Sequence, residues 1–113
     1  MSDANLLRIE IEPTPVFNSA ITYHIIGFVP ADPSVWLQEL SLRIGLVPGV
    51  ERRFYGAEAN DELWLNVMLQ SGVNWQDIDR AVLAMIRDFL GRLVGVAPGA
   101  ISAERVPFRG ASS

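Results

Sequence analysis

The chain of 113 residues contains no cysteine and no lysine, and it has a single histidine, His24. The absence of cysteine excludes structural disulfides, thiolate metal sites and cysteine nucleophiles. One histidine is too few for a histidine-rich metal site, and no carboxylates cluster beside it in the sequence. We therefore predict that the protein holds neither a metal nor a cofactor.

Basic residues are few, and they are not concentrated in any one segment. All nine are arginines scattered along the chain, and the formal net charge is -4. A nucleic-acid surface carries a clustered basic patch, so we expect no binding to nucleic acid. The chain also lacks an apolar run of the ~20 residues that a membrane span needs, and its first residues show no signal-peptide pattern. These features predict a cytoplasmic protein that does not enter membranes.

Hydrophobic residues make up 50% of the chain, which is enough for one core, and 113 residues is a usual length for one domain. The segment 6–12 alternates apolar with charged side chains, which is typical of a half-exposed strand that ends at Pro13. Residues 21–106 hold the remaining predicted elements, and 107–113 are expected to form a flexible tail. We predict a single domain over residues 1–113.

Two amphipathic helices are predicted between the strands. The first has Asp32 as a capping residue and Pro33 at its first position, and it stops near Gly45. The second, longer helix begins after Asn74 and ends at Gly95. An apolar stripe at helical spacing is expected to face the core from this second helix. It consists of Ile78, Val82, Met85, Ile86, Phe89 and Leu93.

Four strands are predicted to accompany these helices. Those at 21–29 and 63–70 are apolar on both faces, while those near Val50 and Ile101 carry charges typical of sheet edges. The order β-α-β-β-α-β, with the first and third strands central, is the ferredoxin-like split βαβ pattern. We therefore predict an α+β two-layer sandwich, in which two helices cover one face of an antiparallel sheet and the N-terminal strand is an addition to it.

The stretch IIGFVPADPSVWLQELSLRIGLVPGVERRFYG resembles the strand, helix and Pro-Gly-Val turn of ferredoxin-like metal-chaperone domains. It also resembles the junction of strand and helix in amino-acid-binding ACT domains. The resemblance spans residues 21–90 and implies a small carrier or regulatory domain. Such chaperones hold copper or zinc with a cysteine pair after the first strand, so the lack of cysteine excludes metal carriage. ACT domains have a glycine-rich start to the first helix, where this chain has Asp32 and Pro33, and no functional residue is carried over.

The segment LWLNVML, residues 63–69, is central in the predicted sheet and has an unusual second face. Its odd-numbered residues are all aliphatic, so they are expected to face the helices. Two helices can cover only one face of a sheet, so Trp64, Asn66 and Met68 should lie on the other one, which we call the open face. With Ile26 and Phe28 from the strand 21–29, this face is too apolar to be left in water.

Three covers for the open face are considered: a second copy in a homodimer, a different protein, or the chain's own residues 13–20. In the simplest interpretation the face is buried by self-association or by those residues and has no further role. In the functional interpretation aromatic and arginine side chains anchor a protein partner there, since such residues dominate interface energies. The predicted binding residues are Phe28, Arg53, Tyr55, Trp64, Asn66 and Met68.

Three classes of function remain open at this point. The first is a small acidic protein-interaction module of the immunity-protein or adaptor type, which suits the size, the charge and the lack of a catalytic motif. The second is a cofactor-independent enzyme of the dimeric α+β-barrel type, with His24 as general base beside Asn66 and Tyr55. The third is a small-ligand regulatory domain. We favour the first, with no catalytic residue, and the simpler role for His24 is a hydrogen bond at an interface.

Overall fold

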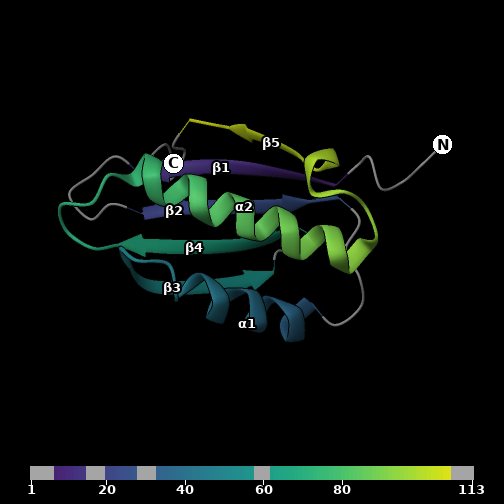
Figure 1. Ribbon diagram of the computed structural model, residues 1–113, viewed down its shortest axis with the longest axis horizontal. Coiled ribbons are helices and arrows are strands. Elements are labelled where there is room, and N and C mark those ends of the chain that lie inside the picture. Colours follow the sequence, from purple (N-terminus) through teal and green to yellow (C-terminus); the bar gives the residue numbers. More distant parts are fainter. Residues whose placement is uncertain (1–6, 15–19, 28–32, 58–61, 108–113) are drawn as a thin grey trace.

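The computed structural model describes residues 7–14, 20–27, 33–57 and 62–107, whose helices and strands are arranged as Figure 1 shows. The strands of these ranges are β1 (Arg8–Thr14), β2 (Ala20–Ile26), β3 (Val50–Ala57), β4 (Leu63–Leu69) and β5 (Ser102–Arg105). The helices are α1 (Pro33–Ile44) and α2 (Trp75–Val94), and a 3-10 turn, η2 (Pro98–Ala100), precedes β5. Among these described helices, none has the length and apolar character to cross a membrane.

The ends of the helices follow the predicted capping residues. Pro33 is the first residue of α1, where its missing N–H costs nothing. The side chain of Asn74 accepts a hydrogen bond from the backbone N–H of Gln76 at 2.9 Å, which satisfies one of the free donors at the start of α2. Gly95 adopts a left-handed conformation with φ 80, and its N–H donates to the carbonyl of Gly91. Both ends of α2 are therefore fixed by local chemistry.

The face that α2 buries differs slightly from the predicted stripe. Its buried apolar residues are Ile78, Val82, Ile86 and Leu90. Met85 and Phe89 are only half-buried, and Leu93 is exposed. Residues at intervals of four form a ridge inclined to the helix axis, and α2 packs along that ridge, which turns Leu93 out of the core and Leu90 into it.

The sheet has the strand order β3-β4-β2-β1-β5. As predicted, β2 and β4 are interior strands and β3 and β5 are edges. The extra strand β1 lies between β2 and β5, so it is an interior strand as well. The prediction of a purely antiparallel sheet is wrong, because β1 pairs with β5 in parallel while the other pairs are antiparallel. Both β1 and β5 run opposite to β2, so they must be parallel once they become neighbours.

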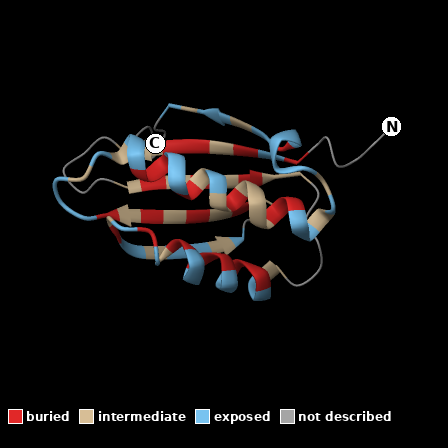
Figure 2. Ribbon diagram, in the orientation of Figure 1, coloured by how far each residue is buried: buried red, intermediate tan, exposed pale blue. Residues whose placement is uncertain are grey.

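The core lies between the sheet and the two helices, which cover the same face (Figures 1 and 2). The predicted orientation of β4 is confirmed, since Leu63, Leu65, Val67 and Leu69 are all buried. The facing residues from α1 include Leu37, Leu40 and Ile44. Burying an aliphatic side chain of this size contributes about 1.5–3 kcal/mol, so this layer holds the sheet and the helices together. The side chains on the other face of the sheet do not belong to this core.

Candidate functional site

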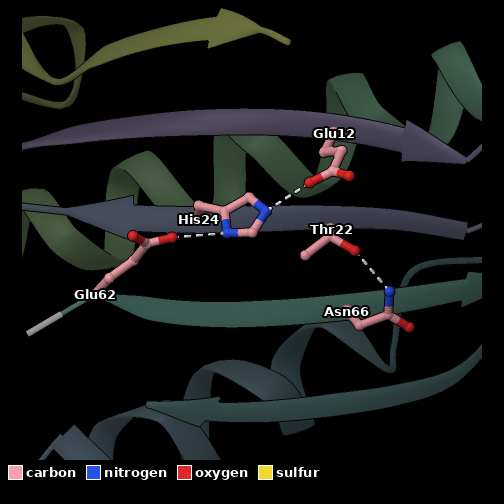
Figure 3. Close-up of polar contacts among 5 residues, drawn as sticks. All are labelled: Glu12, Thr22, His24, Glu62 and Asn66. Carbon is pink, nitrogen blue, oxygen red and sulfur yellow. Dashed lines mark hydrogen bonds and ion pairs between the residues drawn. The ribbon is translucent and has the colours of Figure 1, made fainter. Parts of the chain in front are cut away.

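The open face of the sheet is defined by the strand register. Side chains that pair laterally share a face, and they alternate along each strand. His24 on β2 pairs with Glu10 on β1 and Trp64 on β4, and Thr22 pairs with Glu12 and Asn66. The centre of the open face therefore holds a cluster of polar side chains. Figure 3 shows Glu12, Thr22, His24, Glu62 and Asn66 there, with the helices behind the sheet.

His24 is held at both ring nitrogens. Its Nε2 lies 2.8 Å from Oε1 of Glu12, and its Nδ1 lies 3.0 Å from Oε2 of Glu62 (Figure 3). Glu12 is buried, whereas Glu62 and His24 are half-buried. The imidazole thus joins β1 to the residue just before β4, and all three side chains are fixed in place.

This geometry limits what His24 can do chemically. An ionised carboxylate only accepts hydrogen bonds, so each of the two contacts needs a proton on the ring or on the carboxyl group. Between two ionised carboxylates, an imidazolium satisfies both contacts and a neutral ring satisfies one. A general base needs a ring nitrogen aimed at its substrate, and both nitrogens of His24 are engaged with glutamates.

Asn66 has the hydrogen-bond partner that its position between two large apolar groups requires. Its Nδ2 donates to Oγ1 of Thr22 at 2.8 Å across the β2–β4 pair (Figure 3). Without that bond the half-buried amide would cost free energy against water. Asn66 and Thr22 therefore form a cross-strand contact that keeps this part of the face polar and ordered.

The predicted placement of Arg53 and Tyr55 on the open face is wrong. A β-bulge lies between Val50 and Arg52, where two residues of β3 advance against one of β4. A shift of one residue moves every following side chain to the opposite face. Arg53 consequently lies on the helix side, where its Nε donates to the carbonyl of Ser41 at 2.9 Å. Tyr55 pairs with the buried Leu65, so it is also on the helix side, and the set His24, Asn66 and Tyr55 is not brought together.

The bulge brings Arg52, Phe54 and Gly56 to the open face instead. Phe54 has 47% of its surface exposed and pairs with Asn66 in the middle of β4. A Cβ on Gly56 would lie 2.6 Å from Cζ2 of Trp64, so the indole ring packs directly against this glycine. An aromatic ring laid over an edge glycine covers the exposed backbone there. Trp64 therefore has a structural role and still contributes a half-buried apolar surface.

The two halves of the open face differ in polarity and charge. Its β3–β4 half presents Phe54, Trp64 and Met68, with Arg52 at the edge. Its β1–β5 half presents acidic groups, since Glu10 pairs with Glu104 across the parallel strands, and Arg8 lies 3.6 Å from Glu10. The face therefore offers an apolar area bordered by a mainly acidic one.

Some predictions concern parts of the chain that the structure does not describe. Phe28, a predicted binding residue, lies outside the described residues, and so do Val29, Asp32 and residues 15–19 of the proposed cover 13–20. The described ends of that segment, Pro13, Thr14 and Ala20, belong to β1 and β2. The proposed cover therefore stays a prediction.

A small pocket lies on the helix side, between α1 and β3. Tyr55 lines it together with Pro33 and Leu37, and its volume is about 270 Å³. Ligand pockets usually occupy about 300–1,000 Å³ and present a few convergent polar groups. This pocket is slightly smaller than that range, and its described lining holds no charged group. Within the described ranges, no group of three or more metal-ligating side chains is assembled.

Sequence reasoning missed Phe54, Arg52, Glu12 and Glu62 as members of the open face. Phe54 was hidden by the bulge between Val50 and Arg52, because that part of β3 contains no glycine or proline that would indicate a bulge. Glu12 is one of the alternating charges of β1, and only the neighbouring position of β1 and β2 brings it to His24. The alternation of apolar and charged residues in β1 was the one sequence signal for the position of Glu12.

Comparisons of this chain with protein-family models, with curated proteins and with solved structures found no match. The functional argument therefore rests on the geometry of the open face.

Proposed function

We propose that the protein acts by binding another protein through the open face, as an adaptor or an immunity-type protein does. The observation that carries this proposal is Phe54, which is 47% exposed beside Trp64 and Met68 on the side of the sheet away from the helices. We infer a ferredoxin-like architecture with β1 inserted, which leaves this face to a partner. Aromatic side chains on a rigid support are the usual anchors of protein interfaces.

The polar groups of the face support a binding role because they are already fixed. Glu12, His24 and Glu62 hold one another, and Asn66 holds Thr22. Side chains that are ordered before binding lose little conformational entropy when a partner arrives. The network therefore provides a rigid floor beside the apolar anchors rather than a set of reacting groups.

The charge of the face indicates the chemistry of the partner. Glu10 and Glu104 lie on β1 and β5, while the anchors Phe54 and Met68 lie on β3 and β4. Complementary potentials speed association and suppress wrong partners. The partner surface that fits has an apolar patch next to arginine or lysine side chains.

The same division of the face favours a different protein over a second copy. A two-fold axis along the strands would place the apolar half of one copy on the acidic half of the other. A two-fold axis across the strands would place the acidic half on its own copy. An isologous contact that covers the whole face must be self-complementary, and neither arrangement is. A heterologous partner avoids both mismatches.

The proposal is tested with the variant Phe54→Asp. Wild-type protein and the variant are immobilised in equal amounts, and proteins of the native lysate that they retain are compared quantitatively. The matched control is Val35→Asp, the same kind of change at a residue of α1 that is 68% exposed on the other side of the molecule. We expect a retained partner to be lost from Phe54→Asp and kept by Val35→Asp.

Thermal unfolding of both variants must stay cooperative for the comparison to count, which their exposed positions favour. The proposal fails if the retained proteins are the same for Phe54→Asp as for wild type. It also fails if wild type retains nothing above an unrelated bait. A partner whose binding survives high salt unchanged would contradict the assigned role of the acidic half.

A further inference from the structure

The outer surface of α2 carries a second, independent pattern. A groove runs between this helix and the turn after α1, and its lining includes Leu46, Pro48, Ala81, Ala84 and Met85. Leu46 is 82% exposed, the largest value among the exposed large hydrophobic residues of the described ranges. An exposed leucine beside an apolar groove costs free energy in water that a contact would recover.

Charged residues occur in a symmetric order along α2, and two of them, Asp88 and Arg92, line this groove. Asp77 and Arg92 lie near the two ends of the helix, and Arg80 and Asp88 lie between them. Ala84 is close to the midpoint of both pairs in the sequence. Residues 77, 81, 84, 88 and 92 recur at intervals of three or four, so they lie along one side of the helix.

This order is complementary to itself when the helix is reversed. With a two-fold axis beside Ala84, Asp77 of one copy lies level with Arg92 of the second copy, and Arg80 lies within about one residue, ~1.5 Å, of the level of Asp88. Parallel alignment would instead place like charges together. The intrahelical pairs are exposed, with 3.8 Å between Asp77 and Arg80 and 3.3 Å between Asp88 and Arg92. Exposed pairs of this kind are weak and can exchange partners at low cost.

We propose that two copies of this chain associate through antiparallel α2 helices, with Leu46 of each copy covered at the edge of the shared groove. The small side chains of Ala81 and Ala84 let the helices approach, and the apolar groove and the crossed charge pairs specify the alignment. Because a two-fold contact is isologous, each favourable pair occurs twice. This contact lies on the helix side of the molecule and uses none of the open-face residues.

The test is a charge exchange, followed by sedimentation velocity over a concentration series at low and high salt. The single variants Asp77→Arg and Arg92→Asp each convert two attractions in the dimer into repulsions, so each should raise the dissociation constant about tenfold or more. The double variant Asp77→Arg/Arg92→Asp restores opposite charges across the two-fold and should recover most of the wild-type association. The side chains of Asp77 and Arg92 are 67% and 75% exposed, so the fold should tolerate the changes.

A second variant blocks the centre of the contact. Ala84→Arg keeps good helix propensity, so it should stay folded by circular dichroism and become monomeric at every concentration measured. Wild-type protein that sediments as a monomer throughout would overturn the proposal. It would also be overturned if the double charge exchange associated no better than the two single variants, or if Ala84→Arg remained a dimer.

Discussion

Tyr23 has a hydroxyl group whose pKa is shifted far from its ordinary value. Its hydroxyl donates a 2.7 Å hydrogen bond to Oδ1 of Asp79, and both residues are buried between β2 and α2. Burial raises the pKa of the Tyr23 hydroxyl far above its ordinary value, and the charge of Asp79 and the hydrogen bond to it raise this pKa further. The pair ties helix to sheet, and the Tyr23 hydroxyl supplies a hydrogen-bond donor to the buried carboxylate.

This pKa shift predicts a loss of stability at high pH. Above pH ~10 the unfolded chain releases the tyrosine proton while the folded chain keeps it, so the unfolded state binds fewer protons. Below pH ~10 the stabilisation from the shifted pKa of Tyr23 is fully present. Above pH ~10 the free energy of unfolding should fall by up to about 1.4 kcal/mol per pH unit. Urea unfolding across this range measures the slope.

The variants Tyr23→Phe and Tyr55→Phe separate this effect from general alkaline damage. Tyr23→Phe should remove the slope, and it should lower stability at pH 7 by about 1–3 kcal/mol because Asp79 loses its donor. Tyr55 is the other tyrosine of the chain and is exposed, so Tyr55→Phe should keep the wild-type slope. An unchanged slope in Tyr23→Phe would show that another group governs the alkaline transition.

At the scale of elements, local chemistry predicted the helices and long-range pairing decided the strands. Pro33, Asn74 and Gly95 marked helix ends because caps and left-handed glycines act within one turn of the chain. The bulge after Val50 left no comparable local mark, and it moved Arg53 and Tyr55 to the wrong face for the predicted site. The place of β1 in the sheet could not be predicted either, since alternation specifies the two faces of a strand and not its neighbours.

The capping prediction can be tested directly on α2. Asn74→Ala removes the acceptor of the Gln76 N–H and should lower the free energy of unfolding by about 1 kcal/mol. Asn74→Asp keeps an acceptor at the positive end of the helix, so it should match or exceed wild type. Urea unfolding of the three proteins gives both values. If Asn74→Ala and wild type are equally stable, the cap bond makes no net contribution.

At the scale of the whole molecule, the two-layer arrangement separates two surfaces. Both helices lie on one side of the sheet (Figure 1). The groove along α2 is on that side, and the open face is on the other. The two proposals are therefore compatible, because a partner on the open face would not block a dimer through α2, and such a dimer would present two open faces. Two linked sites bind a repetitive partner more tightly than one site does.

The separation predicts that the two surfaces can be disabled one at a time. Phe54→Asp should lose the lysate partner and remain a dimer in sedimentation velocity. Ala84→Arg should become a monomer and still retain the partner, although less of it if the partner is multivalent. If Phe54→Asp is instead the monomeric variant, self-association uses the open face, as the alternative from the sequence has it.

The sequence by itself determined the α+β class, the helix ends, the buried face of β4 and the absence of cysteine chemistry. These follow from composition, periodicity and caps, which depend on residues close together in the chain. Only the tertiary structure decided that β1 is an interior strand, that β1 and β5 are parallel, and that Phe54 replaces Tyr55 on the open face. The contact of His24 with Glu12 and Glu62 was decided in the same way, because it joins residues far apart in the chain through the register of neighbouring strands. Register is a property of paired strands, and no single strand encodes it.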